Sequence, residues 1–166
     1  MATWYVSKAD GADANAGTST SAAKYTPQAA LESASAGDII EFIDSETYYG
    51  VSSSGGTGAY TYYLQDSQEK INITIRAGTD SDGNKYRPVC SGKSDNETGS
   101  VNARIAVKYD HGWDISGIEF RDFGNAGLIY SDVSSSALTV RDCIFHHITT
   151  REGHAHGVNA DAGILL

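Results

Sequence analysis

Two stretches of sequence decide the fold that we predict for this chain, Asp114-Ile-Ser-Gly-Ile-Glu-Phe-Arg-Asp-Phe123 and Thr139-Val-Arg-Asp-Cys-Ile-Phe-His-His-Ile148. Placed one above the other, they match apolar residues at a constant offset of 25 residues. A period of this size is typical of repeat architectures. Because β-branched and aromatic residues form the runs, and Gly, Asn, Asp and Ser separate them, we expect each repeat to consist of strands. The matched pairs are Ile115 with Val140, Ile118 with Cys143, Phe120 with Phe145, and Phe123 with Ile148.

The same segments carry a family resemblance. Trp113-Asp-Ile-Ser-Gly-Ile-Glu-Phe120 and Leu138-Thr-Val-Arg-Asp-Cys-Ile-Phe145 are similar to successive coils of the right-handed parallel β-helix (pectate-lyase-like) superfamily. The opening segment, from Trp4-Tyr-Val-Ser7 onward, resembles the N-terminal portion of such proteins. The resemblance covers nearly the whole chain and implies an all-β fold, a right-handed parallel β-helix (solenoid) of about five coils.

We expect residues 1–166 to form a single domain with a distinct N-terminal part. Residues 1–37 are predicted to form a strand, a loop and a short capping helix, and residues 38–166 the coils. Thr26 suits the N-cap of this helix, with Pro27 at its first position and Gly37 at the C′ position after its end. Such a helix would cover the open N-terminal edge of the stack.

Ile71-Asn-Ile-Thr-Ile75 is the cleanest alternation of apolar and polar residues in the chain. Side chains of a strand point alternately to its two faces. The pattern therefore predicts a strand with its three isoleucines inward and with Asn72 and Thr74 outward.

Composition limits the partners and the location that we expect. The chain has 21 acidic and 12 basic residues, a formal net charge of −9, so nucleic acid and anionic membranes are not expected partners. Cys90 and Cys143 are too few for a disulfide framework and are predicted to be buried free thiols. The given chain shows no signal peptide and no transmembrane segment, which favours a virion protein or a mature extracellular protein.

Three tyrosines form the first candidate ligand-binding site. Tyr48, Tyr49 and Tyr63 flank a Ser/Gly-rich loop, and aromatic faces stack well on sugar rings. The alternative is that these rings fill the core.

Four histidines near the end of the chain form a candidate divalent-metal site. His146, His147, His154 and His156 lie within the last 21 residues, and paired imidazoles bind zinc, copper or nickel. The alternative is that they are surface polar groups, because no Cys or carboxylate shares their spacing.

The resemblance to lyases implies stacked carboxylates that hold calcium beside a Lys or Arg base. At the 25-residue offset of the two matched segments Arg121 stacks on His146 and Asp142 lies over Gly117, so within these segments no acid is placed on another acid. The inverting hydrolases of the superfamily need a pair of carboxylates, and no two acidic residues are adjacent in the chain. We therefore expect no catalytic residues, and we expect that the chain alone does not cleave polyuronates.

The last segment, Val158 to Leu166, ends in apolar residues without a helix, proline or charge run to protect a strand edge. Unprotected edges pair with further strands. We expect either a longer natural chain, or self-association or a partner chain at this segment.

Together these observations favour a non-catalytic structural or attachment module with glycan binding as one option. A phage virion protein, such as a tail fiber or decoration protein, is the preferred setting, followed by a secreted surface protein. The alternative is the N-terminal part of a polysaccharide lyase or glycoside hydrolase of the pectate-lyase-like superfamily. A third hypothesis is a metal-binding solenoid centred on the histidines.

Overall fold

The computed structural model describes residues 1–49, 51–52, 60–65, 70–91, 102–107, 112–121, 129–131, 138–146 and 158–159. For residues 51–52, 60–65, 102–107, 129–131, 146 and 158–159 it describes the backbone alone. No helix among these residues is long and apolar enough to cross a membrane.

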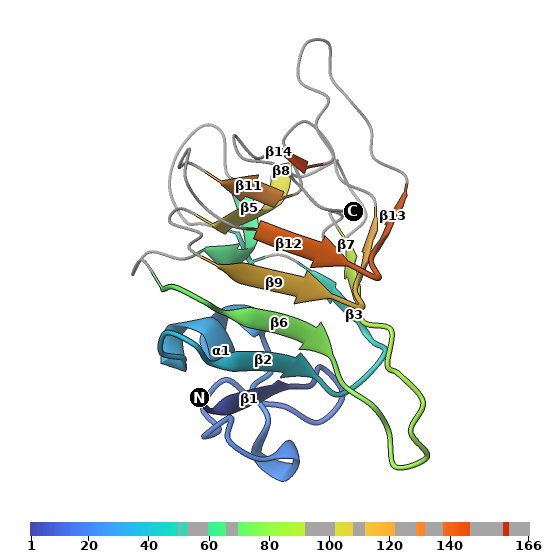
Figure 1. The fold of residues 1–166 in the computed structure, drawn as a ribbon. Coiled ribbons are helices and arrows are strands. Elements are labelled where there is room, and N and C mark those ends of the chain that lie inside the picture. The colour runs from blue at the N-terminus through green and yellow to red at the C-terminus, as the bar shows by residue number, and fades with distance from the viewer. Residues whose placement is uncertain are drawn as a thin grey trace.

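Strands that are distant in sequence lie side by side in a parallel, five-stranded first sheet (Figure 1). Its order is β1 (Thr3–Val6), β2 (Ile39–Phe42), β6 (Thr74–Ala77), β9 (Trp113–Ser116) and β12 (Leu138–Arg141).

The other described strands form two further sheets. The second sheet is parallel and runs in the order β13 (Ile144–His146), β10 (Glu119–Arg121), β7 (Val89–Ser91) and β3 (Thr47–Tyr49). The third sheet runs in the order β14 (Val158–Asn159), β11 (Ile129–Ser131), β8 (Asn102–Val107), β5 (Tyr60–Gln65) and β4 (Val51–Ser52). Its edge strand β4 is antiparallel to β5, whereas its other pairs are parallel.

The prediction of a right-handed parallel β-helix of about five coils is wrong for this chain. The structure shows parallel sheets of five and four strands with few helices, and no solenoid is identified in the part of the chain that it describes. Along the first sheet Thr3 pairs with Ile39, Ile39 with Thr74, Thr74 with Asp114 and Asp114 with Thr139, in steps of 36, 35, 40 and 25 residues. The 25-residue offset therefore holds for the last step of this sheet only, because connections of different length separate the earlier strands. The division of the chain at residue 37 stays a prediction.

The packing predicted for the last two repeats is confirmed. Ile115 pairs with Val140 and Phe120 with Phe145 in parallel strands at the expected offset. The Phe120 and Phe145 rings stack with centroids 5.3 Å apart. Ile118 is buried in the same core, and Cys143 packs against it. The predicted pair of Phe123 and Ile148 lies outside the described residues.

One core joins the first and second sheets. Trp113 is its largest fully buried side chain, and its indole N–H donates a 2.7 Å hydrogen bond to the Lys70 carbonyl oxygen. Burying an indole requires such a partner, because an unpaired N–H away from water is costly. Other fully buried side chains are Phe42, Ile40, Ile75, Ile115 and Phe120 from the two sheets, and Ile73 directly before β6.

The predicted inward position of Ile71 is wrong. Ile71 is 40% exposed, whereas Ile73 and Ile75 are fully buried. Asn72 has a φ of 56°, in the left-handed region, so the chain turns between Ile71 and Ile73 instead of continuing as a strand. Strict alternation begins only after this turn, with β6.

The predicted helix is confirmed as α1 (Pro27–Ser33), but its C-cap is Ala34, so the prediction of Gly37 at the C′ position is wrong. The Thr26 hydroxyl accepts a hydrogen bond from the Ala29 N–H at 3.2 Å, as an N-cap should. The helix contacts β1, β2 and β5. Its last turn is closed by Lys70, whose ammonium donates to the carbonyl oxygens of Leu31 and Glu32. A cation suits this end of the helix because the free carbonyl groups there carry partial negative charge.

Candidate ligand-binding groove

A row of mostly polar residues crosses the outer face of the first sheet. In the strand register Tyr5 pairs with Glu41, Glu41 with Arg76, Arg76 with Ser116, and Ser116 with Arg141. The neighbouring positions on these strands point inward into the core, as Ile40 and Ile75 show. Because paired strands lie about 4.8 Å apart, side chains that are distant in sequence become close neighbours here.

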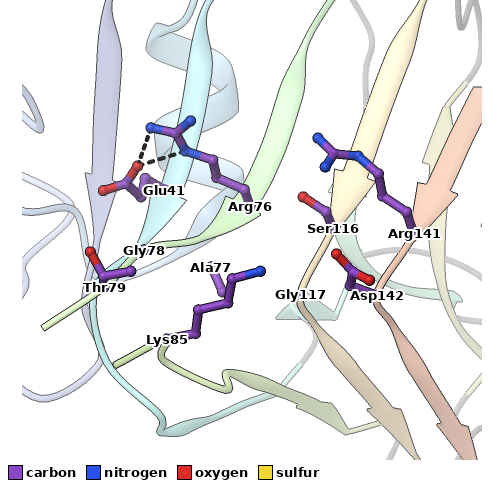
Figure 2. A pocket seen from close by; sticks show the side chains of 10 residues that line it. All are labelled: Glu41, Arg76, Ala77, Gly78, Thr79, Lys85, Ser116, Gly117, Arg141 and Asp142. Atoms are coloured by element: carbon purple, nitrogen blue, oxygen red, sulfur yellow. Dashed lines mark hydrogen bonds and ion pairs between the residues drawn. The ribbon is translucent and has the colours of Figure 1, made fainter. Parts of the chain in front are cut away.

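Four members of this row line a groove of about 360 Å³ at the end of β6 and β9 (Figure 2). Its lining consists of Glu41, Arg76, Ala77, Gly78, Thr79, Lys85, Ser116, Gly117, Arg141 and Asp142.

Small residues form part of this lining, at Ala77, Gly78 and Gly117. A Cβ atom added to Gly117 would lie 3.0 Å from the Ala77 Cβ, and Gly117 has a φ of +75°. A Cβ atom added to Gly78 would lie 2.9 Å from the Glu41 Oε1. Side chains at these two glycines would therefore crowd the groove.

A short hairpin after β6 provides one wall. Thr79 and Lys85 form an antiparallel bridge, and the Asp80 carboxylate accepts hydrogen bonds from the backbone N–H groups of Asp82 and Asn84 at 2.9 Å each. Hydrogen bonds from the backbone and side chain of Asn84 lower the pKa of Asp80. The bonded turn fixes the backbone from which the Lys85 side chain extends.

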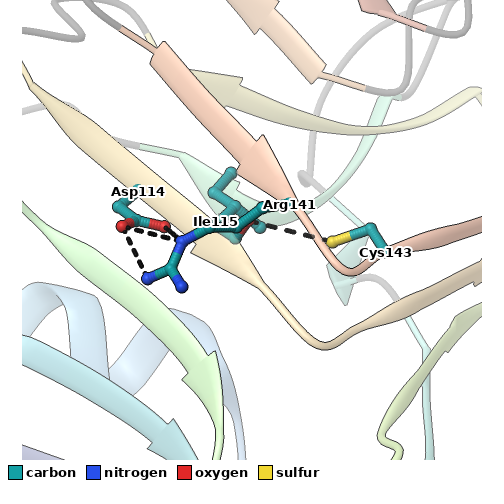
Figure 3. Close-up of polar contacts among 4 residues, drawn as sticks. All are labelled: Asp114, Ile115, Arg141 and Cys143. Atoms are coloured by element: carbon teal, nitrogen blue, oxygen red, sulfur yellow. Dashed lines mark hydrogen bonds and ion pairs between the residues drawn. The ribbon is translucent and has the colours of Figure 1, made fainter. Parts of the chain in front are cut away.

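Two ion pairs hold the guanidinium groups of the row. Arg76 donates from Nε to the Glu41 Oε2 at 2.7 Å, and its Nη2 lies 2.6 Å from the same oxygen. Arg141 contacts the Asp114 carboxylate through Nε at 3.2 Å and Nη2 at 2.9 Å (Figure 3). This contact raises the pKa of Arg141. Each arginine thus binds its carboxylate through the guanidinium edge that carries Nε and Nη2. No hydrogen bond from the Nη1 group of either arginine is seen among the described residues.

Lys85 and Asp142 are exposed charges of the groove for which the described part of the chain shows no such pair. Within the described part of the chain, no hydrogen bond or ion pair engages the Lys85 ammonium, and no hydrogen bond engages the Asp142 carboxylate. Asp142 has a φ of 53° and follows β12 as Gly117 follows β9, so both strands bend at the same level. Among the described residues of the lining, Lys85 is therefore the cation and Asp142 the carboxylate that a ligand can engage without meeting an existing ion pair.

The groove is less acidic than the chain as a whole. Its lining carries three cations, Arg76, Lys85 and Arg141, against the two carboxylates of Glu41 and Asp142, and the Asp114 carboxylate pairs with Arg141 beside it. These six charges sum to zero, whereas the whole chain has a formal charge of −9. An acidic ligand group therefore meets less repulsion here than the net charge of the chain implies.

Of the three tyrosines of the predicted site, the structure describes the side chains of Tyr48 and Tyr49. Tyr48 is only 3% exposed, packs edge-on against Phe42 at 4.8 Å, and donates a 2.7 Å hydrogen bond to Asp44. Burial and the neighbouring Asp44 carboxylate raise the pKa of Tyr48. Tyr49 is half-buried, with the Lys8 ammonium 4.3 Å from its ring centroid. The side chain of Tyr63 lies outside the described structure, so ligand binding by Tyr49 and Tyr63 stays a prediction.

The predicted histidine site falls largely outside the described residues. His146 ends β13, and its backbone pairs with that of Arg121 as the 25-residue offset predicted. Its side chain is not described, and His147, His154 and His156 lie outside the described ranges. The residues that are described contain no group of three potential metal ligands, and the metal prediction stays open.

Both cysteines are free thiols, as predicted. Cys90 is buried, and Cys143 is half-buried with its Sγ 3.9 Å from the Ile115 carbonyl oxygen (Figure 3). Burial raises the pKa of both thiols, which disfavours the reactive thiolate.

Comparison of this chain with protein-family models, curated proteins and solved structures finds no match. The sequence alone did not single out the groove either. Of the charged residues that line it, the resemblance to lyases pointed to Asp142, and no sequence pattern pointed to Glu41, Arg76 or Lys85. The available signal was an outward-facing polar residue near the end of each strand. Such residues can be assigned to one site only when the strand register is known.

Proposed function

We propose that this chain is a non-catalytic attachment module that binds a saccharide in the groove on the first sheet. The observation that carries this proposal is the row from Glu41 to Arg141, which supplies charged donors and acceptors beside small residues. Sugar hydroxyls both donate and accept hydrogen bonds, so a site of this mixed kind matches their chemistry.

The setting that we propose is the surface of a virion, as in a tail or decoration protein, or the surface of a cell. The acidic chain, with a formal charge of −9, supports a partner other than nucleic acid or an anionic membrane. Binding without chemistry is supported by the ion pairs of the groove. The Glu41 carboxylate is held by Arg76, and Arg141 is held by Asp114, so these charged groups are engaged with each other.

We also propose that the chain self-associates, or meets a partner chain, through the segment from Val158 to Leu166. The strands β12, β13 and β14 each stand at one end of their sheet among the described strands, and they lie toward the same end of the molecule (Figure 1). Strand edges that share one end form a common surface for pairing. Sedimentation should show a concentration-dependent oligomer, and a monomer at all concentrations would contradict this part of the proposal.

The saccharide proposal is tested with an array of neutral and acidic oligosaccharides and with two variants. Lys85→Gln combined with Arg141→Gln removes two cations of the groove, whereas Arg87→Gln removes an exposed cation that does not line it. We expect the wild type and Arg87→Gln to retain the same saccharides, and the double variant to lose them. Absence of binding by the wild type, or equal binding by the double variant, would refute the proposal. An assay for unsaturated products from polyuronates should remain negative.

A further inference from the structure

We infer that the groove selects a saccharide with a single carboxylate on an otherwise neutral sugar framework, and that Lys85 binds this carboxylate. The inference rests on the proposed function, because it names the chemical class of the ligand for the same groove. The three cations of the groove differ in whether they already contact a carboxylate.

Lys85 differs from the two arginines in its electrostatic surroundings. Arg76 and Arg141 already contact carboxylate oxygens at 2.6 and 2.9 Å. The Lys85 ammonium has no such contact within the described part of the chain. A ligand carboxylate placed on an arginine would lie beside an internal carboxylate that repels it, whereas one placed on Lys85 would form a charge-assisted hydrogen bond without such a neighbour on the same cation. An acidic sugar therefore gains more binding free energy from a contact with Lys85 than from a contact with either arginine.

The position of Lys85 fits this role. Figure 2 shows its side chain reaching from the hairpin past Ala77, between the Glu41–Arg76 pair and Asp142. The bridge from Thr79 to Lys85 holds the backbone from which the side chain projects. A donor on an ordered backbone loses less freedom on binding than one on a mobile loop.

The acceptor opposite Lys85 argues for a neutral remainder of the ligand. The Asp142 carboxylate is exposed and has no hydrogen bond among the described residues, so it can accept from sugar hydroxyls. It would repel a second carboxylate of a ligand. A site in which, among the described residues, Lys85 and Asp142 have no ion-pair partner therefore suits one acidic group and several hydroxyls.

Carboxylates beside the groove disfavour a densely charged polymer. Asp80 and Asp82 lie on the hairpin that carries Lys85, and Asp114 pairs with Arg141. Charges act on one another over about 8 Å at physiological ionic strength. A polyuronate with a carboxylate on every ring would extend beyond the groove and bring further carboxylates toward these groups, whereas an isolated acidic sugar would not.

The test compares two ligands that differ in one group, methyl β-glucuronide and methyl β-glucoside. Titrations of the isotope-labelled protein are followed by amide chemical shifts for the wild type, Lys85→Gln, Asp142→Asn and the control Arg87→Gln. We expect the wild type and the control to prefer the glucuronide by about fivefold, as a partly exposed ion pair contributes. Lys85→Gln should bind both ligands equally. Asp142→Asn should weaken the glucoside and keep or increase the preference for the glucuronide.

The outcomes separate this inference from the proposed function. Equal binding of both ligands by the wild type, or an unchanged preference in Lys85→Gln, would overturn the role of Lys85 and leave saccharide binding intact. Failure of the wild type to bind either ligand, together with an empty oligosaccharide array, would overturn both. Added salt should weaken the glucuronide only, and equal weakening of both ligands would also count against the inference.

Discussion

Replacing Asp38 by asparagine should destabilise the protein in a pH-dependent way. Asp38 is 5% exposed and joins three segments at the start of the chain. Its Oδ1 accepts from the Ala2 N–H at 2.6 Å, and its Oδ2 accepts from the Trp4 indole N–H at 3.0 Å and the Ser35 N–H at 2.9 Å. An asparagine side chain has only one acceptor oxygen, so at least one of these donors loses its partner.

The magnitude follows from the pKa of the carboxyl group. Burial raises this pKa, but hydrogen bonds from Trp4, Ala2 and Ser35 and the N-terminal ammonium lower it more, from 3.8 to about 2. A shift of this size corresponds to about 2 kcal/mol of stability. Because the folded-state pKa lies below the unfolded value, this contribution is fully present above about pH 4 and is lost as the pH falls toward 2.

The assay is urea denaturation of the wild type and Asp38→Asn between neutral pH and pH 2.5, followed by tryptophan fluorescence. The variant should have a free energy of unfolding lower by about 2 kcal/mol at neutral pH, and the difference should shrink below pH 4. Asp82→Asn is the control, because no hydrogen bond of the exposed Asp82 side chain is seen in the described structure. A difference that stays constant over this pH range would refute the assignment of the low pKa to Asp38.

Three further predictions concern the core and the groove. Phe120→Ala should lower the free energy of unfolding by about 3–5 kcal/mol, because it opens a cavity beside the Phe145 ring; a loss below about 1 kcal/mol would contradict the packing. Gly117→Ala should cost more stability than Gly37→Ala, because both have positive φ but only the Cβ at Gly117 would meet another side chain, at 3.0 Å; equal melting temperatures would argue against this crowding. Cys90 should resist alkylation at neutral pH until the protein unfolds, because it is 2% exposed and burial raises its thiol pKa; rapid labelling of the native protein, located by mass spectrometry, would place it elsewhere.

The part of the fold that the sequence predicted is the part where strand and turn lengths repeat. Phe120 and Phe145 were paired correctly because the two segments that contain them have equal length and similar patterns. The regular solenoid predicted for the rest of the chain is wrong, because the steps between the earlier strands are 36, 35 and 40 residues and carry no matching pattern. Ile71 was misplaced because a backbone turn at Asn72 is not visible in a binary pattern of apolar and polar residues.

The groove shows why the site was harder to predict than the core. Arg76 and Arg141 are brought together by strand register, which depends on connections of unequal length. Tyr48 had the residue type of a sugar-binding side chain, but its ring is buried and its hydroxyl is bonded to Asp44. Residue type suggested a ligand, whereas burial decides which side chains can reach one.

The most direct test of saccharide binding in the groove is chemical-shift mapping with an oligosaccharide that the array identifies. If the groove is the site, the largest amide shifts should fall on residues 76–79, 85, 116–117 and 141–142, which meet only in the folded chain. The same titration of the double variant Lys85→Gln and Arg141→Gln should show no shifts at these positions. Shifts centred on Tyr49 and β3 instead, with none in the groove, would contradict the assignment of the site.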